Sequence, residues 1–303
     1  MSSSFLGRAR EIAAVVAPTT VVTALLFYFG YVALRARFRY YGVDLDLVDL
    51  TLQETLLYGV EVLYPPVLVI ALIGLAVTGL HAGVRWLLSA PERDVASGWV
   101  GVLLVLVGLL ALVRGFVGFL VARVGAGEHF PVTPVALALG SAAVAYGGWM
   151  LHTVAARRRA WPAESNLRQT ARRSVGWLAL VGVASAFWAT NEFAAAHGRG
   201  KAEEFAEGLP ARPHVLLHSK EPLRGVPCGV EHRDGGAGAG EFRHRYKGLR
   251  LLVESGGRLF VVPAHWRDGR DGGTPSRTLV VPYGDDVRVE LRPTPRLPSR
   301  PDC

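Results

Sequence analysis

Three charged side chains lie within segments that are otherwise apolar and long enough to cross a bilayer: Glu61, Arg114 and Glu192. A charge at the centre of a membrane costs at least about 3 kcal/mol on insertion scales, so such a residue is a candidate functional residue by default. One interpretation is an anion or proton site made by Arg114 with Glu61 and also Glu192. The other is a structural ion pair, or an arginine that reaches the outer surface.

The nine histidines raise the question of a metal site, because five of them lie near the C-terminus: His214, His218, His232, His244 and His265. On a helix, the spacing of His214 and His218 would direct both imidazoles at one ion. On a strand it sets them about 13 Å apart. There is no HExxH motif and no acid at a ligand spacing. We therefore expect no metal and no other cofactor.

Catalytic motifs are missing from the sequence. The run Gly236-Ala-Gly-Ala-Gly240 lacks the dinucleotide-binding spacing, and Gly200-Lys201 is not followed by the serine or threonine of a phosphate loop. No Gly-x-Ser-x-Gly elbow occurs. We assign no catalytic residue and expect no enzyme. The net charge of +8 is spread along the chain, which argues against nucleic acid as a partner.

The elements that must position these residues are long apolar segments. Half of the residues are hydrophobic and the mean hydropathy is +0.29, above that of an ordinary soluble domain. At about 1.5 Å per residue, five segments are long enough to cross the ~30 Å hydrocarbon layer as helices. They lie at about residues 12–34, 57–83, 99–124, 132–154 and 174–195. In the second segment, Pro65-Pro66 predicts a kink, with regular helix from Val67 onward.

Small residues follow helical spacing in the last three apolar segments. One stripe contains Gly101, Gly108, Ala111, Gly115, Gly118 and Ala122; a second contains Ala136, Gly140, Ala143 and Gly147; a third contains Ala179, Gly182, Ala186 and Ala189. Lipid provides no hydrophobic force between helices, so close backbone approach along such stripes takes its place. We expect a bundle whose tightest part is formed by these three helices.

The most basic short loop predicts the orientation. It is predicted between the fourth and fifth segments and carries six cations against Glu164: Arg157, Arg158, Arg159, Arg168, Arg172 and Arg173. With a cytoplasmic N-terminus, the cytoplasmic side also receives Arg8, Arg10, Arg85 and Arg93. The outer side receives Arg35, Arg37, Arg39 and Arg123. Ten cations against four place the C-terminal region outside the cytoplasm.

The regions outside the apolar segments also carry local signals. Thr51 and Glu54 have the spacing of a capping box at a helix start. From Lys201 to Leu209 we expect one short helix. Strand-like runs follow at 214–217, 226–231, 246–254, 258–263, 278–281 and 287–291. The runs 246–254 and 258–263, joined by Gly256-Gly257, are the best candidate for a β-hairpin. The prolines after Arg292 predict a disordered tail.

Two stretches carry a resemblance to a known family. One runs from Tyr40-Tyr-Gly-Val-Asp-Leu-Asp-Leu to Glu54 and on to Tyr64-Pro-Pro66, and the other runs from Tyr246-Lys-Gly-Leu to Val262-Pro263 with the later Val281-Pro-Tyr283. Both resemble uncharacterised actinobacterial multi-pass membrane proteins, in which a membrane bundle precedes a small C-terminal β-domain. The resemblance would cover most of the chain and implies no activity.

Together these patterns predict a membrane α-helical bundle of about five transmembrane helices (residues 1–197), followed by a small all-β C-terminal domain (residues 198–303). We expect a multi-pass protein of the bacterial inner membrane whose β-domain is extracytoplasmic and acts as a sensor or protein-interaction module. Its partners would be the lipid bilayer and another envelope protein or a second copy of itself. The alternative is a small transporter or channel component that uses Arg114, Glu61 and Glu192. Whether Cys228 and Cys303 pair is left open.

Overall fold

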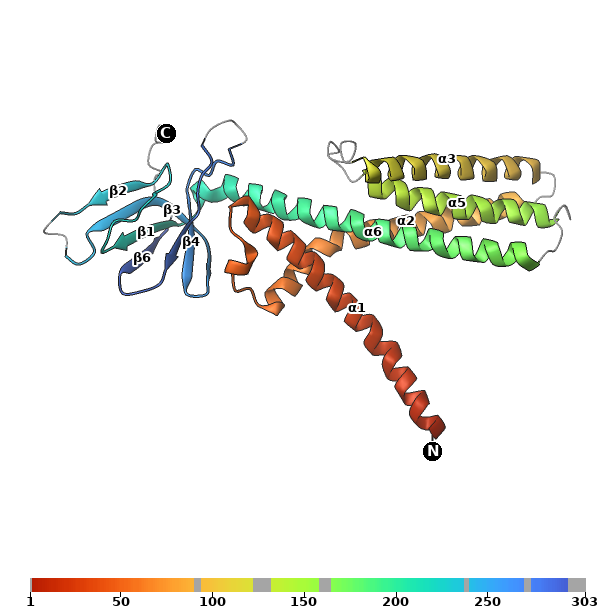
Figure 1. Ribbon diagram of the computed structural model, residues 1–303, viewed down its shortest axis with the longest axis horizontal. Helices are drawn as coiled ribbons and strands as arrows, with labels where there is room; N and C mark the ends of the chain where they lie inside the picture. Colours follow the sequence, from red (N-terminus) through yellow and green to blue (C-terminus); the bar gives the residue numbers. More distant parts are fainter. Residues whose placement is uncertain are drawn as a thin grey trace. The chain divides into compact units, whose positions relative to one another are not determined.

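The computed structural model describes residues 2–89, 94–121, 132–157, 165–236, 240–269 and 274–293. Its long helices are α1 (Ser2–Tyr40), α2 (Leu52–Ser89), α3 (Asp94–Leu120), α5 (Val132–Arg157) and α6 (Ser165–Gly208) (Figure 1). Each contains a stretch long and apolar enough to cross a membrane: Thr19–Tyr40, Leu52–Trp86, Val95–Leu120, Val132–Ala156 and Arg173–Ala211. An antiparallel β-sheet follows them in the chain. Both features were predicted from the sequence.

The chain forms two compact units. One contains Met1–Val62 and Ala194–Cys303, and the other contains Leu63–Phe193. The domain boundary predicted between residues 197 and 198 falls inside the continuous helix α6. The short helix expected over residues 201–209 is the last part of α6 and not a separate element.

In the first unit, α1 runs further than expected and ends at Tyr40. Arg35, Arg37 and Arg39, which follow the apolar segment predicted to end at about residue 34, are therefore helical. Arginine is a good helix former, so these residues favour continuation. The helix ends where Gly42 adopts a φ of 69°. There the amide of Gly42 donates to Arg39 O and the amide of Val43 donates to Phe38 O, which is the Schellman pattern of a helix end.

Helix α2 begins with the predicted capping box. The amide of Thr51 donates to Glu54 Oε2 at 2.8 Å, and the amide of Glu54 donates to Thr51 Oγ1 at 3.2 Å. The helix then continues through Pro65 and Pro66. Regular helix was predicted from Val67 onward, and it already begins at Leu52. Neighbouring helices and adjustments of the backbone allow such prolines in membrane-spanning helices.

Helix α1 touches α2 and α6 at glycines. A Cβ atom at Gly59 of α2 would collide with Leu26 O, and one at Gly198 of α6 would collide with Ala33 O. A Cβ atom at Gly30 of α1 would lie 2.9 Å from Gly59 N. The three backbones therefore approach more closely than any side chain would permit. None of these glycines belongs to the predicted stripes.

The sheet contains β1 (His214–Ser219), β2 (Glu231–Asp234), β3 (His244–Ser255), β4 (Arg258–Pro263), β5 (Leu279–Pro282) and β6 (Val287–Arg292). The strand order is β5-β4-β3-β1-β6, β2 also pairs with β3, and every pairing is antiparallel. The predicted hairpin is confirmed, and Gly256 and Gly257 both have positive φ, as a tight hairpin turn requires. The predicted strand at 226–231 is wrong, since β2 begins only at Glu231.

Strand β4 is apolar from Leu259 to Pro263 because both of its faces are covered there. Leu259 and Val261 enter one hydrophobic cluster, built from sheet residues such as Tyr246. Phe260 and Val262 enter another, to which the helices contribute. Alternation along a strand sends successive side chains to opposite faces, so a continuous apolar run marks a strand that is buried on both.

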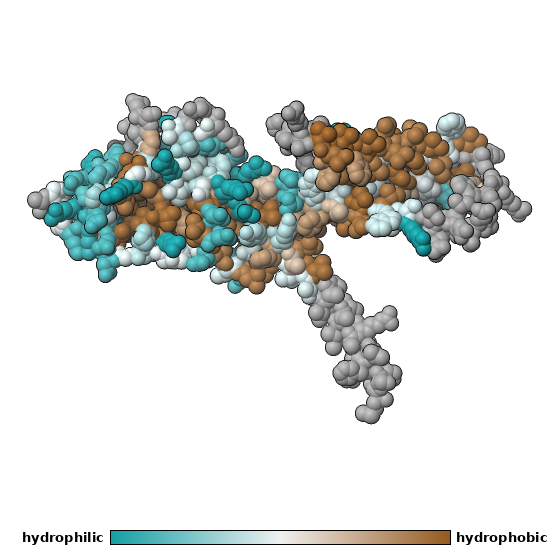
Figure 2. Space-filling model, in the orientation of Figure 1, coloured by the Kyte–Doolittle hydropathy of each residue, from teal (hydrophilic) through white to brown (hydrophobic). Residues whose placement is uncertain are grey.

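In the second unit, α3 and α5 pack side by side along the predicted stripes (Figure 1). A Cβ atom at Gly108 would lie 2.9 Å from Gly140 O, and one at Gly147 would lie 2.8 Å from Gly101 O. At Gly182 of α6 a Cβ atom would meet nothing within 4 Å, so the close approach predicted for the fifth segment is not found at this glycine. Apolar residues cover the visible surface of α3, whereas hydrophilic residues predominate over the sheet (Figure 2).

Candidate functional site

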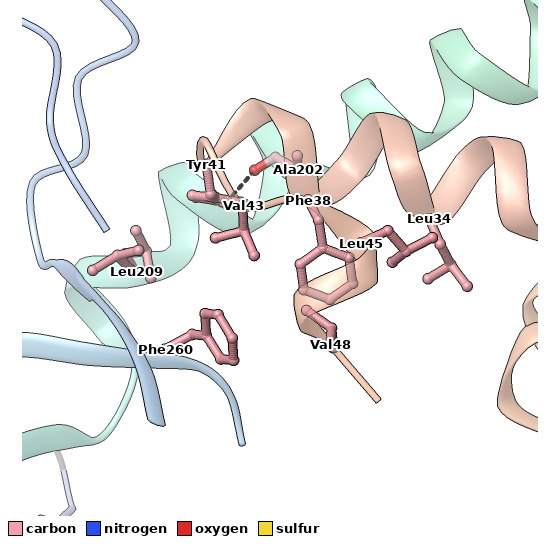
Figure 3. Packing of buried hydrophobic residues seen from close by; sticks show 10 residues of the cluster. Leu34, Phe38, Tyr41, Val43, Leu45, Val48, Ala202, Leu209 and Phe260 are labelled. Atoms are coloured by element: carbon pink, nitrogen blue, oxygen red, sulfur yellow. Dashed lines mark hydrogen bonds between the residues drawn. The ribbon is translucent and has the colours of Figure 1, made fainter. Parts of the chain in front are cut away.

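The end of α1, the loop after it, the end of α6 and strand β4 share one hydrophobic core, which we call the junction core (Figure 3). Its buried members are Leu34, Phe38, Tyr41, Val43, Leu45, Val48, Ala202, Leu209, Phe260 and Val262. The loop begins at the Schellman turn, which directs Val43 back toward Phe38. The sheet is therefore packed directly against helix ends that are distant in the sequence.

Tyr41 is the polar centre of the junction core. Its side chain is 1% exposed, and its hydroxyl donates to Ala202 O of α6 at 2.7 Å. The hydroxyl of Thr278, just before β5, donates to Tyr41 O at 2.6 Å. The ring of Trp266 packs edge-on at 5.0 Å. Burial raises the pKa of Tyr41 far above its usual range, so the hydroxyl keeps the proton that it donates to α6.

Arg250 of β3 joins the sheet to the end of α6. Its side chain is fully buried, and Nε donates to Leu209 O at 2.9 Å while Nη2 donates to Pro210 O at 3.2 Å. The same guanidinium lies 3.0 and 3.2 Å from the two ring nitrogens of His214. Burial lowers the pKa of Arg250, but a guanidinium stays protonated in proteins. It therefore places a positive charge at the carboxyl end of a helix, where the helix dipole favours one.

The loop after α1 also holds the tip of the β3–β4 hairpin. The amide of Asp49 donates to Ser255 Oγ at 2.7 Å. The Asp49 carboxylate lies where a Cβ atom at Gly256 would be. The positive φ of 56° and this contact both require glycine at position 256.

Cations and aromatic rings connect the helix ends beside this core. The guanidinium of Arg37 lies 5.9 Å from the ring centre of Tyr58 and 5.7 Å from that of Phe205. The guanidinium of Arg212 lies 3.9 Å from the ring centre of Phe205. Such contacts contribute about 0.5–2 kcal/mol each. Arg37 is thus a packing residue of the junction as well as one of the four cations predicted to lie on the outer side.

Two other arginines of α1 line a small open cavity of about 180 Å³. Its lining consists of Arg35, Arg39, Gly42, Val43, Asp44 and Leu45. Asp44 brings a negative charge to the same wall, so the lining is mixed in sign.

The predicted intramembrane charges have different surroundings. Glu61, in the first unit, lies 3.6 Å from His197 Nε2 and 3.7 Å from Lys201 Nζ through Oε1. Glu61 and Lys201 are both more than a third exposed, so solvent screens their attraction and the pairing contributes little to stability. His197 and Lys201 were not predicted as partners of Glu61, although their spacing of four places both on one helix face.

Arg114 and Glu192 belong to the second unit. Arg114 extends along α3 to Gly118, where a Cβ atom would come within 2.8 Å of Nη1 and would also collide with Thr133 of α5. Arg114 thus lies at the α3–α5 seam. Glu192 accepts a hydrogen bond from Trp188 Nε1 at 3.3 Å, one turn earlier on α6. A joint site of Glu61, Arg114 and Glu192 stays a prediction.

The basic segment is largely helical and was expected to be a loop. Helix α5 ends at Arg157, and α6 begins at Ser165, so Arg168, Arg172 and Arg173 lie in the first turns of α6. Arg173 is exposed. Arg158 and Arg159 lie outside the described residues, as do Cys303 and the predicted tail from residue 294.

Histidines of the sheet make contacts that the sequence did not predict. His214 and His218 both lie on β1, where His214 contacts Arg250 and His218 Nε2 lies 3.7 Å from Glu290 Oε1. His232 and His244, on neighbouring strands, lie 3.1 Å apart between ring nitrogens. Within the described ranges, no group of three or more His, Cys, Asp or Glu side chains is arranged to hold a metal. The β2–β3 register was needed to find the second pair.

Comparisons with protein-family models, with curated proteins and with solved structures find no match to this chain. The fold itself defines the class of protein: five helices able to span a membrane, followed by an antiparallel sheet.

Proposed function

We propose that this chain is an integral protein of a bacterial cell membrane that holds its β-sheet domain on the extracytoplasmic side and acts as a sensor. Its α-helical bundle spans the bilayer with a cytoplasmic N-terminus, and the sheet binds another envelope protein or a second copy of the chain. The resemblance to the actinobacterial multi-pass family is part of this proposal. The single observation that carries the proposal is the junction core.

The junction core favours a sensor over a simple display module. A displayed domain needs only a flexible linker, whereas here η3 (Leu209–Ala211) alone separates α6 from the short lead into β1. Arg250 binds the carbonyls of that connection, and Phe260 packs against residues of α1 and α6. A packed core switches between discrete arrangements and does not deform continuously. Binding at the sheet would therefore change the positions of the helix ends that share its core.

Two observations support the orientation. The ends of α1 and α6 meet in one core, and the four intervening crossings of α2, α3, α5 and α6 return the chain to the same side. The cation count favours a cytoplasmic basic segment.

Single-cysteine labelling tests the orientation. In a chain whose native cysteines are replaced by serine, Arg288→Cys places a thiol on exposed β6 and Arg173→Cys places one on the exposed basic segment. We expect a membrane-impermeant maleimide to label Arg288→Cys in intact cells and Arg173→Cys only after lysis. The reverse pattern would place the sheet in the cytoplasm and overturn the proposal.

Spin-label distances test whether the sheet is rigidly coupled to α6. Paired labels at Arg288 and Glu203, both outside the junction core, should give one narrow distance distribution in the full chain. Arg250→Met keeps an unbranched apolar side chain in the buried site and removes the donors, so it should broaden that distribution. A distribution that is broad in the native chain would mean that the sheet moves independently of α6 and would reduce the protein to a display module.

A transporter or channel component is the second candidate function, because Arg114 lies at the seam between two apolar helices. Arg114→Ala distinguishes the two functions. A transporter loses solute flux in this variant. In a sensor the sheet still binds its partner, and in-cell photo-crosslinking from position 288 detects that binding.

A further inference from the structure

His232 of β2 and His244 of β3 form a pair of imidazoles on one face of the sheet. Nε2 of His232 lies 3.1 Å from Nδ1 of His244, and the ring centres are 5.2 Å apart. In the β2–β3 register His232 is opposite Tyr246 and His244 is opposite Asp234, so all four side chains start from the same face. His232 is exposed and His244 is half-buried, so solvent reaches the pair.

The His232 ring is held in place before any ligand arrives. The His232 ring stacks on the Tyr246 ring at 4.7 Å with 11° between the planes. Tyr246 is fully buried, and its hydroxyl accepts a hydrogen bond from the amide of Leu223 at 2.7 Å. Both histidines lie on paired antiparallel strands. Little conformational entropy is therefore lost when a ligand fixes the two rings.

The separation of the nitrogens matches two ligands of one metal ion. An ion about 2.05 Å from each nitrogen would see the two nitrogens, 3.1 Å apart, at about 98°. That angle is close to the 90° between neighbouring ligands in square-planar and octahedral complexes. Imidazole nitrogens in such geometry are typical of Cu(II) and Ni(II), and Cu(II) binds most tightly along the divalent series.

We propose that His232 and His244 bind a divalent transition-metal ion of the Cu(II) class on the extramembrane sheet. His232 binds through Nε2 and His244 through Nδ1, and the proton now shared between these atoms moves to the other nitrogen of its ring. Among the described residues, no third His, Cys, Asp or Glu completes a metal-binding group with them. The remaining coordination positions are therefore open to water or to an added ligand.

Titration of the full chain with Cu(II) tests this site. The chain is purified in detergent micelles without a histidine tag, and Cu(II) is added from a glycine buffer. We expect one equivalent to bind, with electron paramagnetic resonance showing nitrogen ligands in a tetragonal field. His244→Asn should weaken Cu(II) binding at least about tenfold. Mutation of residues that only support metal ligands already costs that much, and His244 is itself a ligand in this proposal.

Two further variants separate loss of a ligand from loss of structure. His232→Phe keeps an aromatic ring on Tyr246 and removes the nitrogen, so it should fold normally and weaken Cu(II) binding as much as His244→Asn. Arg233→Ala changes the exposed neighbour on the opposite face of β2 and should bind Cu(II) like the native chain. Native affinity in His232→Phe or His244→Asn would overturn the proposal, as would the absence of a tight equivalent in the native chain.

Discussion

The junction core and the α3–α5 seam are held together by different physical means. In the junction core, large side chains such as Phe260 are fully buried, and polar groups such as Arg250 and Tyr41 have hydrogen-bond partners. At the seam, glycines allow two backbones to touch, while large side chains point outward and Leu110 is 70% exposed. A core that excludes water is stabilised by burial, whereas helices in lipid are stabilised by close contact.

The largest expected effect comes from truncating one apolar side chain in each region. Phe260→Ala should cost about 3–5 kcal/mol of unfolding free energy, because it removes burial and leaves a cavity. Leu110→Ala, on the exposed face of α3, should cost little in micelles, because lipid or detergent fills the space. Thermal unfolding of the full chain in detergent checks both. Equal losses would mean that α3 packs against protein and would remove the contrast.

At the seam, adding a methyl group should cost more stability than removing an exposed side chain. Gly108→Ala places a Cβ atom 2.9 Å from Gly140 O, so the helices must separate, at about 1–3 kcal/mol for overpacking. Gly148→Ala is the control on α5, where a Cβ atom meets nothing within 4 Å. We expect the control to be as stable as the native chain or more so. Unfolding temperatures in micelles measure the difference, and a neutral Gly108→Ala would contradict the seam.

The same comparison can be made where α6 passes α1. Gly198→Ala collides with the backbone carbonyl of Ala33, whereas Gly200→Ala, half a turn further on, meets nothing within 4 Å. Gly200→Ala should stabilise α6 by up to about 1 kcal/mol through helix propensity. Gly198→Ala should lower stability and broaden the spin-label distances at the sheet. Both variants behaving alike would show that α1 and α6 do not touch there.

The smallest expected effect is a pH dependence confined to the sheet. Burial lowers the pKa of His218, the nearby Glu290 offsets part of this, and Arg245, Arg288 and Arg292 lower the pKa further. The unfolded chain therefore binds the proton more readily, and stability falls as the pH drops below the ordinary value of about 6.5.

Replacing His218 tests that dependence. His218→Gln should lose less stability than the native chain between about pH 7.5 and pH 5.5, as followed by thermal unfolding. If both chains lose the same amount, His218 is not the titrating group.

Much of the fold was predictable because its signals are local. The five apolar segments, the Thr51–Glu54 capping box and the Gly256-Gly257 hairpin each depend on residues close together in the chain, and all are confirmed. The end of α1 was placed too early, because the apolar run ends at about residue 34 whereas the Schellman turn at Gly42 sets the helix end. Partners of Glu61 were missed because His197 is more than a hundred residues away.

By itself the sequence determined which segments are helical and apolar, since a run of side chains reveals its periodicity and its preference for lipid without reference to the rest of the chain. Only the tertiary structure decided that Phe260 shares one core with Phe38, that Arg250 reaches Leu209 and that His232 meets His244. Those contacts depend on strand register and on where helices end, and a shift of one residue in either would send each side chain to another face.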